Sequence, residues 1–172
     1  MRTGTLDTPI GRITLTADAD GKKLLELNLP RAGARPRDGG RDAVPRAIRE
    51  PIEAYFRGDL GALDAIEIAP EGTPFFRHVW TTLRRVRPGE VVSYAELARR
   101  AGRPKAVRGA AMANARNPIA IVVPCHRVIG ANGHLWGYGG GLDMKRALLC
   151  HEGVAVGDDL FVDLEATAAA AR

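Results

Sequence analysis

The chain has 172 residues and a formal net charge of +5, a length that fits one ordinary domain or two small ones. Hydrophobic residues make up 45% and charged residues 26% of the sequence, a balance that can bury a core and excludes wholesale disorder. No run of about 18 apolar residues occurs, which excludes an apolar membrane-spanning helix.

The first thirty residues have the pattern of β structure. Short runs of alternating or β-branched residues cover Thr3–Leu6, Ile10–Ala17 and Lys23–Leu29, with Asp, Pro and Gly between them. From Pro30 to Pro45 the chain has almost no large apolar side chain, which indicates a loop. We therefore predict a short antiparallel sheet followed by a loop.

A helix is expected next, because apolar residues recur every fourth position over 48–56. Pro51 has no backbone N–H to donate, so the helix is predicted to begin only near Glu50. The segment Asp59–Gly72 then has the composition of a connector, in which the apolar run Ile66–Ala69 could add an edge strand.

The second half of the chain changes to a helical period. Thr73 is a favourable N-cap with Pro74 at the first helical position. The capping box Ser93–Glu96 opens a second helix that ends at Gly102, and Lys105–Ala115 forms a third. Two short helices joined by a tight turn predict a helix-turn-helix, although a helical hairpin packed through small residues has the same pattern.

The positive charge of the chain is concentrated over these helices. Residues 75–116 carry 10 Lys and Arg against 2 Asp and Glu, whereas residues 1–74 and 117–172 have net charges of −1 and −2. Such a concentration indicates contact with a nucleic acid, and the alternative is an ordinary solvated helical surface.

Cys125 lies in a Pro-Cys-His turn that follows the apolar run Ile119–Val123. A thiolate is the reactive form of cysteine, and the neighbouring His126 can take its proton, so the pair suits nucleophilic catalysis. A free cysteine also commonly just fills buried space, and this alternative stays open at this point.

The cysteine count bears on location and metal binding. Two cysteines are too few for a disulfide framework, and the N-terminus has no basic segment followed by an apolar one, so we expect a reducing, cytoplasmic location. Cys150 follows Leu148 and Leu149 in an apolar helical pattern, which predicts a structural side chain. No Cys-x-x-Cys pair occurs and the other histidines are scattered, so neither a metal nor a cofactor is expected.

The chain strongly resembles the O6-alkylguanine-DNA alkyltransferases, or methylated-DNA–protein-cysteine methyltransferases, in the adjoining runs GEVVSYAELARRAGRPKAVRGAAMANAR and NPIAIVVPCHRVIGANGHLWGYGGGLDMKRALLCHEG. The Pro-Cys-His-Arg-Val core is the most specific part, and the match covers Thr73 to Gly153. The earlier run GTLDTPIGRITLTADADGKKLLELNL looks more loosely like the family's smaller domain. The resemblance implies an α+β fold with a small N-terminal α/β domain (1–72), a mainly helical C-terminal domain containing the helix-turn-helix (73–157) and a tail (158–172).

The resemblance implies a DNA repair protein that flips O6-alkylguanine, mainly O6-methylguanine, out of double-stranded DNA and transfers the alkyl group irreversibly to Cys125. Each molecule would act once, as a monomer with no membrane, cofactor or obligate protein partner. In the family's scheme His126 is a base acting through a water and Glu152 orients it, although without the motif Glu152 would be taken for a surface residue. Asn117 would brace the turn, and Tyr94 would donate to guanine N3 or simply pack on the core.

The family's pocket maps onto the residues after the cysteine. Backbone carbonyls of Cys125 and Val128 would accept hydrogen bonds from the exocyclic amine of guanine. Tyr138 would lie against the base, and the amide of Gly139 would approach O6. A common family pattern has Ser at the position of Gly139, so this loop is expected to be more mobile. Trp136 would narrow the pocket against bulky adducts, or it would pack on the far side of the loop.

The family carries its second helix into the minor groove. Arg108 would fill the gap left by the flipped base. Small residues would permit close backbone approach, namely Ala106, Gly109, Ala110 and Ala113. Phosphate contacts would come from Arg99, Arg100, Arg103, Lys105 and Arg116.

Two other functions compete with this one. The first is a non-catalytic helix-turn-helix protein that binds DNA or recognises damage without repairing it, and the presence of Cys125 argues against it. The second is a Cys-His hydrolase, which is opposed by the lack of any further residues suited to an acyl substrate.

Overall fold

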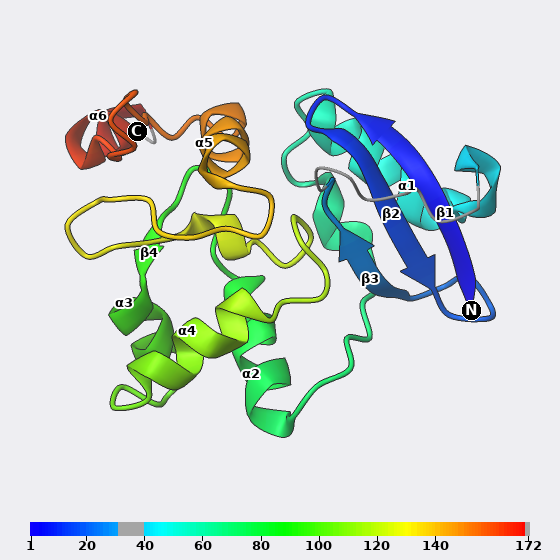
Figure 1. Cartoon of the computed structure of the whole chain (residues 1–172), viewed down its shortest axis with the longest axis horizontal. Coiled ribbons are helices and arrows are strands. Elements are labelled where there is room, and N and C mark those ends of the chain that lie inside the picture. Colours follow the sequence, from blue (N-terminus) through cyan, green and yellow to red (C-terminus); the bar gives the residue numbers. More distant parts are fainter. Residues whose placement is uncertain (31–39, 171–172) are drawn as a thin grey trace. The chain divides into compact units, whose positions relative to one another are not determined.

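The computed structural model describes residues 1–30 and 40–170, and the first of these ranges forms the antiparallel sheet that the sequence predicts (Figure 1). Its order is β1 (Arg2–Thr8), β2 (Gly11–Ala17) and β3 (Leu24–Asn28). Leu6, Ile13 and Leu15 are buried, because side chains alternate between the two faces of a strand and these three share the inner face.

The helix after the sheet begins earlier than predicted. Helix α1 spans Arg46–Phe56 with Pro51 inside it, so the expected start near Glu50 was wrong. The Pro45 carbonyl accepts the first helical N–H groups, and Pro51 costs the helix one hydrogen bond. Burial of Ile48, Ile52 and Tyr55 on one face of α1 offsets the loss of this hydrogen bond.

The predicted edge strand Ile66–Ala69 is only a single bridge to β3. Leu24 donates its N–H to the Glu67 carbonyl at 2.9 Å and accepts from the Ala69 N–H at 3.0 Å. The preceding residues Ala62–Ala65 form a 3-10 turn, η2, so the chain meets the sheet edge only briefly.

The predicted loop Pro30–Pro45 falls partly outside the described residues, which leave out 31–39. Its described end contains a 3-10 turn, η1 (Arg41–Ala43), which lies before α1.

The three helices predicted for the second half are confirmed: α2 (Pro74–Leu83), α3 (Tyr94–Arg100) and α4 (Val107–Ala115). The Thr73 hydroxyl accepts the Phe76 N–H at 3.2 Å, and the Ser93 hydroxyl accepts the Glu96 N–H at 3.1 Å, so both predicted N-caps form. Helix α4 begins at Val107, slightly later than expected, because the residues before it form a turn. Helices α3 and α4 make the predicted helix-turn-helix (Figure 1).

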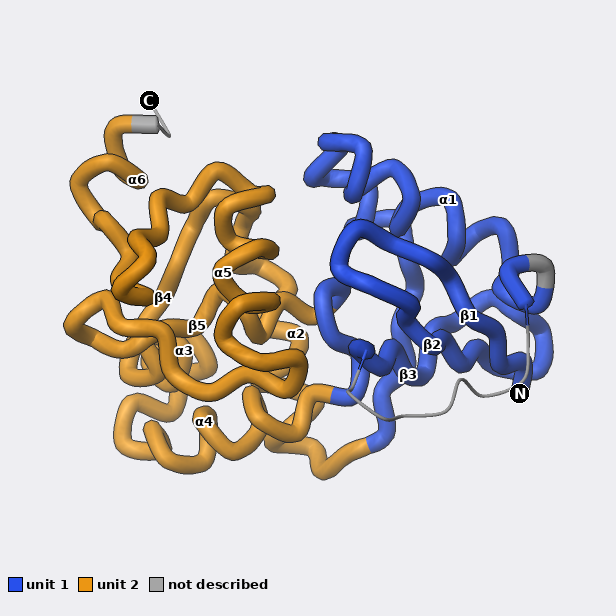
Figure 2. Tube along the Cα trace, turned by 45° about the horizontal axis from the view of Figure 1, so that its top comes forward, with its two compact units in different colours: residues 1–71, 118–122 blue, residues 72–117, 123–172 orange. Residues whose placement is uncertain are grey.

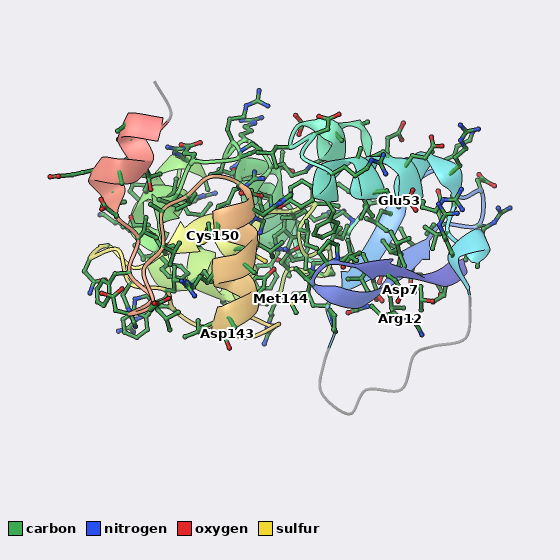
Figure 3. The ribbon with its side chains drawn as sticks, turned by 90° about the horizontal axis from the view of Figure 1, so that it is seen from above. Asp7, Arg12, Glu53, Asp143, Met144 and Cys150 are labelled. Carbon is green, nitrogen blue, oxygen red and sulfur yellow. The ribbon has the colours of Figure 1, made fainter. Side chains whose placement is uncertain are left out.

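The rest of the second half contains two short strands and two helices: β4 (Val92–Ser93), β5 (Val128–Ile129), α5 (Leu142–His151) and α6 (Leu164–Ala170). Strands β4 and β5 pair in parallel. Cys150 was predicted to pack in the core, but it is exposed on α5 (Figure 3), because Leu148 and Leu149 occupy the buried face of that helix. None of the helices in the described ranges is long and apolar enough to cross a membrane.

The Ala-rich composition of Ala166–Arg172 predicts a frayed tail, but its described part belongs to α6, so this prediction was wrong there. The Asp163 carboxylate accepts the Ala166 N–H at 2.9 Å and so caps the helix, while the Thr167 hydroxyl accepts the Ala155 N–H at 3.2 Å. The cap and this tertiary hydrogen bond stabilise a helix that the Ala-rich composition by itself did not predict. Residues 171–172 lie outside the described part.

The chain divides into two compact units (Figure 2). The first holds Met1–Glu71 and Pro118–Val122, and the second holds Gly72–Asn117 and Val123–Arg172. Within the first unit, Leu27 of β3 donates to the Pro118 carbonyl at 2.9 Å. The segment just before the cysteine turn is therefore bound to the edge of the N-terminal sheet.

Candidate active site

Cys125 opens a 3-10 turn, η3 (Cys125–Arg127), between the buried apolar run and β5. Pro124 precedes the turn as its N-cap, with φ −81° and ψ 64°. The Cys125 N–H donates to the Val123 carbonyl at 2.8 Å. The thiol is almost fully buried, with 7% of the residue exposed. The local sequence therefore places one cysteine in the interior on a 3-10 turn.

The Asn117 side chain braces this turn. Its Nδ2 donates to the Val123 carbonyl at 2.7 Å, across the segment Pro118–Val122 that belongs to the other unit. The same side chain hydrogen-bonds the Cys125 thiol. Asn117 thus holds both the start of the turn and the sulfur.

His126, Glu152 and Arg127 form a buried network behind the cysteine. His126 Nε2 lies 2.9 Å from Glu152 Oε1, and Arg127 donates from Nε to Oε2 and from Nη2 to Oε1, both at 2.8 Å. Arg127 Nη1 also donates to the Val86 carbonyl. The side chains of His126 and Glu152 are 0% exposed. Glu152, taken for a surface residue without the motif, is thus the centre of a buried network.

Burial and the charges of the network together set the protonation of Glu152 and His126. Burial opposes ionisation of Glu152, but His126 and Arg127 outweigh it and hold the pKa of Glu152 well below its usual range. Burial lowers the pKa of His126 despite the adjacent carboxylate, so the ring is neutral at neutral pH. A neutral ring facing a carboxylate carries its proton on Nε2. Its Nδ1 has no hydrogen-bond partner within the described residues and is an acceptor.

Lys145 of α5 is a member of the site that the sequence analysis missed. The residue is 0% exposed, and its Nζ donates to the Val128 carbonyl at 2.6 Å and to the Trp136 carbonyl at 3.0 Å. Burial lowers the pKa of Lys145 to about 8, while the charge of Cys125 raises it. The signal was a basic residue on the apolar face of α5, three and four positions before Leu148 and Leu149.

The pKa of the Cys125 thiol is raised by burial, and the Asn117 hydrogen bond and the Lys145 charge oppose this rise. The resting thiol is therefore protonated, and its reaction needs both a base and nearby positive charge. Arg127, also missed from the sequence, serves this arrangement indirectly by holding the Glu152 carboxylate.

Tyr94 is the first residue of α3 and is half-buried. Burial raises its pKa, and so does the charge of Cys125, so the hydroxyl keeps its proton and can donate. The preceding Ser93 pairs with Ile129, which links the start of α3 to the strand that follows η3.

The loop between β5 and α5 carries the remaining predicted pocket residues. The Tyr138 ring meets the His126 ring edge-on, with centroids 6.5 Å apart. A side chain at Gly139 would meet nothing within 4 Å, so packing does not force the departure from Ser. Trp136 stands edge-on to His134 at 5.1 Å, and its indole Nε1 would lie 2.3 Å from a Cβ at Gly130. Trp136 therefore packs against residues of its own loop.

Helix α4 supplies only some of the expected DNA-facing residues. Ala110 and Ala113 are 0% exposed, so these two cannot contact DNA directly and their assignment to the groove was wrong. Their burial packs α4 into the unit, and a Cβ at Gly109 would approach Phe75 to 3.1 Å. Arg108 is exposed, and Ala106 is half-buried beside it.

The predicted phosphate contacts fall into two groups. Arg99 and Arg100 each lie 2.7 Å from Glu96, and Arg100 also lies 2.7 Å from Glu90, so phosphate would have to compete with carboxylates for them. Of the cations predicted to face DNA, Arg103, Lys105, Arg108 and Arg116 are exposed and form no ion pair within the described ranges.

The sequence and the fold are both similar to those of known proteins. Residues 74–154 match the family described as 6-O-methylguanine DNA methyltransferase, DNA binding domain. A methylated-DNA–protein-cysteine methyltransferase of Methanosarcina acetivorans is 44% identical over 149 residues, covering 86% of this chain and 95% of the relative. One from Mycolicibacterium paratuberculosis is 47% identical over 151 residues, covering 86% and 90%. The crystal structure of Mycobacterium tuberculosis OGT in complex with DNA has a TM-score of 0.75 and 39% identity, covering 88% of this chain and 92% of that one.

Proposed function

The chain belongs to the methylated-DNA–protein-cysteine methyltransferases, and on this basis we propose that it repairs O6-alkylguanine in double-stranded DNA by transferring the alkyl group to Cys125. O6-methylguanine is the main substrate. The observation that carries the proposal is a buried thiol beside a neutral histidine, whose Nε2 is held by a carboxylate and whose Nδ1 is an acceptor.

The chemistry follows from these groups. His126 Nδ1 takes the thiol proton through a bridging water, and the thiolate attacks the carbon attached to O6. The new C–S bond forms as the C–O bond breaks, and the electron pair passes to the guanine ring. The Tyr94 hydroxyl donates to N3 and stabilises this charge. A thioether is not readily reversed, so each molecule acts once.

Recognition of guanine uses the backbone around the cysteine. The carbonyls of Cys125 and Val128 accept hydrogen bonds from the exocyclic amine of guanine, and adenine has no amine at that position. Lys145 already donates to the Val128 carbonyl at 2.6 Å and so keeps it oriented. Tyr138 lies against the base, and the Gly139 amide donates to O6.

DNA binding uses the helix-turn-helix, with α4 in the minor groove and Arg108 in the gap left by the flipped base. Ala106 and Gly109 permit close approach. Phosphates contact Arg103, Lys105 and Arg116.

We also propose that residues 1–72 and 73–157 are the family's two domains, with 158–170 packed on the second. The protein acts as a monomer in the cytoplasm, without a metal or cofactor.

The direct test is transfer of label. The protein is incubated with duplex containing O6-[methyl-¹⁴C]methylguanine, and label is expected on the protein at one methyl per molecule, even with excess DNA. Cys125→Ala should abolish transfer, whereas the matched control Cys150→Ala should retain it because Cys150 is exposed on α5. Binding without transfer would support the damage-recognition alternative, and release of more than one methyl per protein would support hydrolysis.

A further inference from the structure

The chain after the matched family region pairs with the pocket loop. The family match ends at residue 154, yet the Leu135 N–H donates to the Leu160 carbonyl and the Val162 N–H donates to the Gly133 carbonyl, both at 2.9 Å. His134 and Phe161 form the antiparallel bridge between these bonds. Residues 133–135 therefore gain a strand-like partner from the C-terminal segment.

This partner is a hairpin, Val156–Val162, with its own internal pairing. Val156 and Val162 form an antiparallel bridge, and the Gly157 N–H donates to the Phe161 carbonyl at 2.9 Å. Both valines lie in a buried cluster with Leu135 of the loop and with Ile129 of β5. The two valines thus anchor the hairpin in the core, next to the strand that follows the cysteine turn.

Three aromatic rings extend the contact to Trp136. The His134 ring lies 4.7 Å from the Phe161 ring and 5.1 Å from the Trp136 ring, so His134 lies between them. Phe161 is 40% exposed and Trp136 is 53% exposed. Such ring pairs contribute energy beyond their buried area, and here they connect the hairpin to the last residue before the glycine-rich part of the loop.

Two glycines give the part of the loop after Trp136 little side-chain packing. Gly137 and Gly139 have no neighbouring atoms within 4 Å of an added Cβ, and glycines leave the backbone free to move. The Trp136 carbonyl is held by Lys145 at 3.0 Å. The position of Tyr138 opposite His126 therefore depends on how Lys145 and the hairpin hold residues 133–136, and on the Gly141 N–H, which donates to the Tyr138 carbonyl at 3.0 Å.

We propose that the hairpin Val156–Val162 is a specificity-determining element of the alkyl pocket: by fixing residues 133–136 it limits how far the loop opens, and so favours methyl over bulky adducts such as benzyl. This inference rests on the proposed function. A loop whose residues 133–136 are held by the hairpin and Lys145 must break hydrogen bonds there to widen the pocket, and weakening the hairpin contact lowers this cost.

The test compares three variants at exposed positions. Phe161→Ala removes the ring against His134, Phe161→Leu keeps an apolar contact, and Leu164→Ala is a control because Leu164 is 51% exposed at the start of α6. Single-turnover rates are measured with O6-methylguanine and O6-benzylguanine in the same duplex. Phe161→Ala is expected to raise the benzyl-to-methyl rate ratio roughly threefold to tenfold. Phe161→Leu should restore much of the ratio, and Leu164→Ala should match the wild type.

A second measurement tests the hairpin contact itself. Hydrogen exchange at the Leu135 amide and acrylamide quenching of Trp136 should both increase in Phe161→Ala, while Trp80, which is buried, contributes little to the quenching. Faster exchange with an unchanged rate ratio would overturn the role in specificity. Unchanged exchange would overturn the anchoring. Absence of transfer from either adduct by the wild type would instead refute the proposed function, together with the inference that rests on it.

Discussion

Lys145 Nζ donates to the Val128 carbonyl at 2.6 Å, and it does so from a fully buried position. The same ammonium donates to the Trp136 carbonyl at 3.0 Å, so one side chain ties the residues after Cys125 to the pocket loop. Its positive charge also favours the thiolate of Cys125. A buried cation is costly, and these two hydrogen bonds and the nearby thiol offset part of that cost.

Removing this charge should make Cys125 less acidic. In a Cys150→Ser background, where Cys125 is the one remaining cysteine, Lys145→Met is expected to shift the midpoint of iodoacetamide alkylation to higher pH, whereas Lys145→Arg should shift it less. The rate is measured against pH by mass spectrometry. An unchanged midpoint in Lys145→Met would contradict the electrostatic role.

The same lysine should make stability depend on pH. Because its pKa is about 8 when folded and 10.5 in the reference state, the unfolded chain binds more protons between these values, and stability rises with pH there. The free energy of unfolding of the wild type relative to Lys145→Met should therefore increase by about 1–3 kcal/mol from pH 8 to pH 10. Urea denaturation at both pH values measures it. An equal difference at the two pH values would show that Lys145 does not titrate as described.

Glu152→Gln should impair both transfer and folding. The amide cannot balance Arg127 or fix the His126 tautomer, so methyl transfer should slow by about 100-fold or more. Loss of one partner from a buried ion pair should also cost about 3–5 kcal/mol of unfolding free energy. Because the folded pKa of Glu152 is lowered, the wild-type advantage is complete above pH 4.5 and shrinks as the pH falls. Glu96→Gln, at an exposed ion pair, is the control that should change little.

Asn117→Ala should slow transfer without preventing binding to DNA. The Val123 carbonyl would lose its donor at 2.7 Å, at a cost of about 1–3 kcal/mol if it stays unsatisfied, and the Cys125 sulfur would lose a hydrogen bond. Single-turnover rates and duplex affinity are measured together. Equal loss of both would indicate general unfolding instead of a local effect at the turn.

Arg108 and the unpaired cations near it should behave differently. Arg108→Ala should slow repair in duplex DNA but leave the reaction with free O6-benzylguanine intact, because no gap needs filling there. Arg103→Ala, Lys105→Ala and Arg116→Ala should each weaken DNA binding and reduce the salt dependence by about one unit of slope. A variant Arg108→Ala with equal losses on both substrates would exclude the gap-filling role.

The sequence alone predicted those elements whose signals are local. Strand alternation, the Thr73 and Ser93 caps and the turn at Gly102 depend on neighbouring residues, and the structure confirms each of them. Cys125 and His126 are neighbours in the chain, so the sequence alone shows that they lie together. Such features are set within a few residues, where backbone preferences and capping act.

Tertiary structure decided which side chains are buried and what they meet. Whether Pro51 interrupts α1, whether Ala113 faces DNA and whether the C-terminal segment is ordered depend on residues far away in the chain. Lys145 became part of the site only when α5 packed beside β5, because burial and charge proximity are properties of the folded interior and not of local sequence.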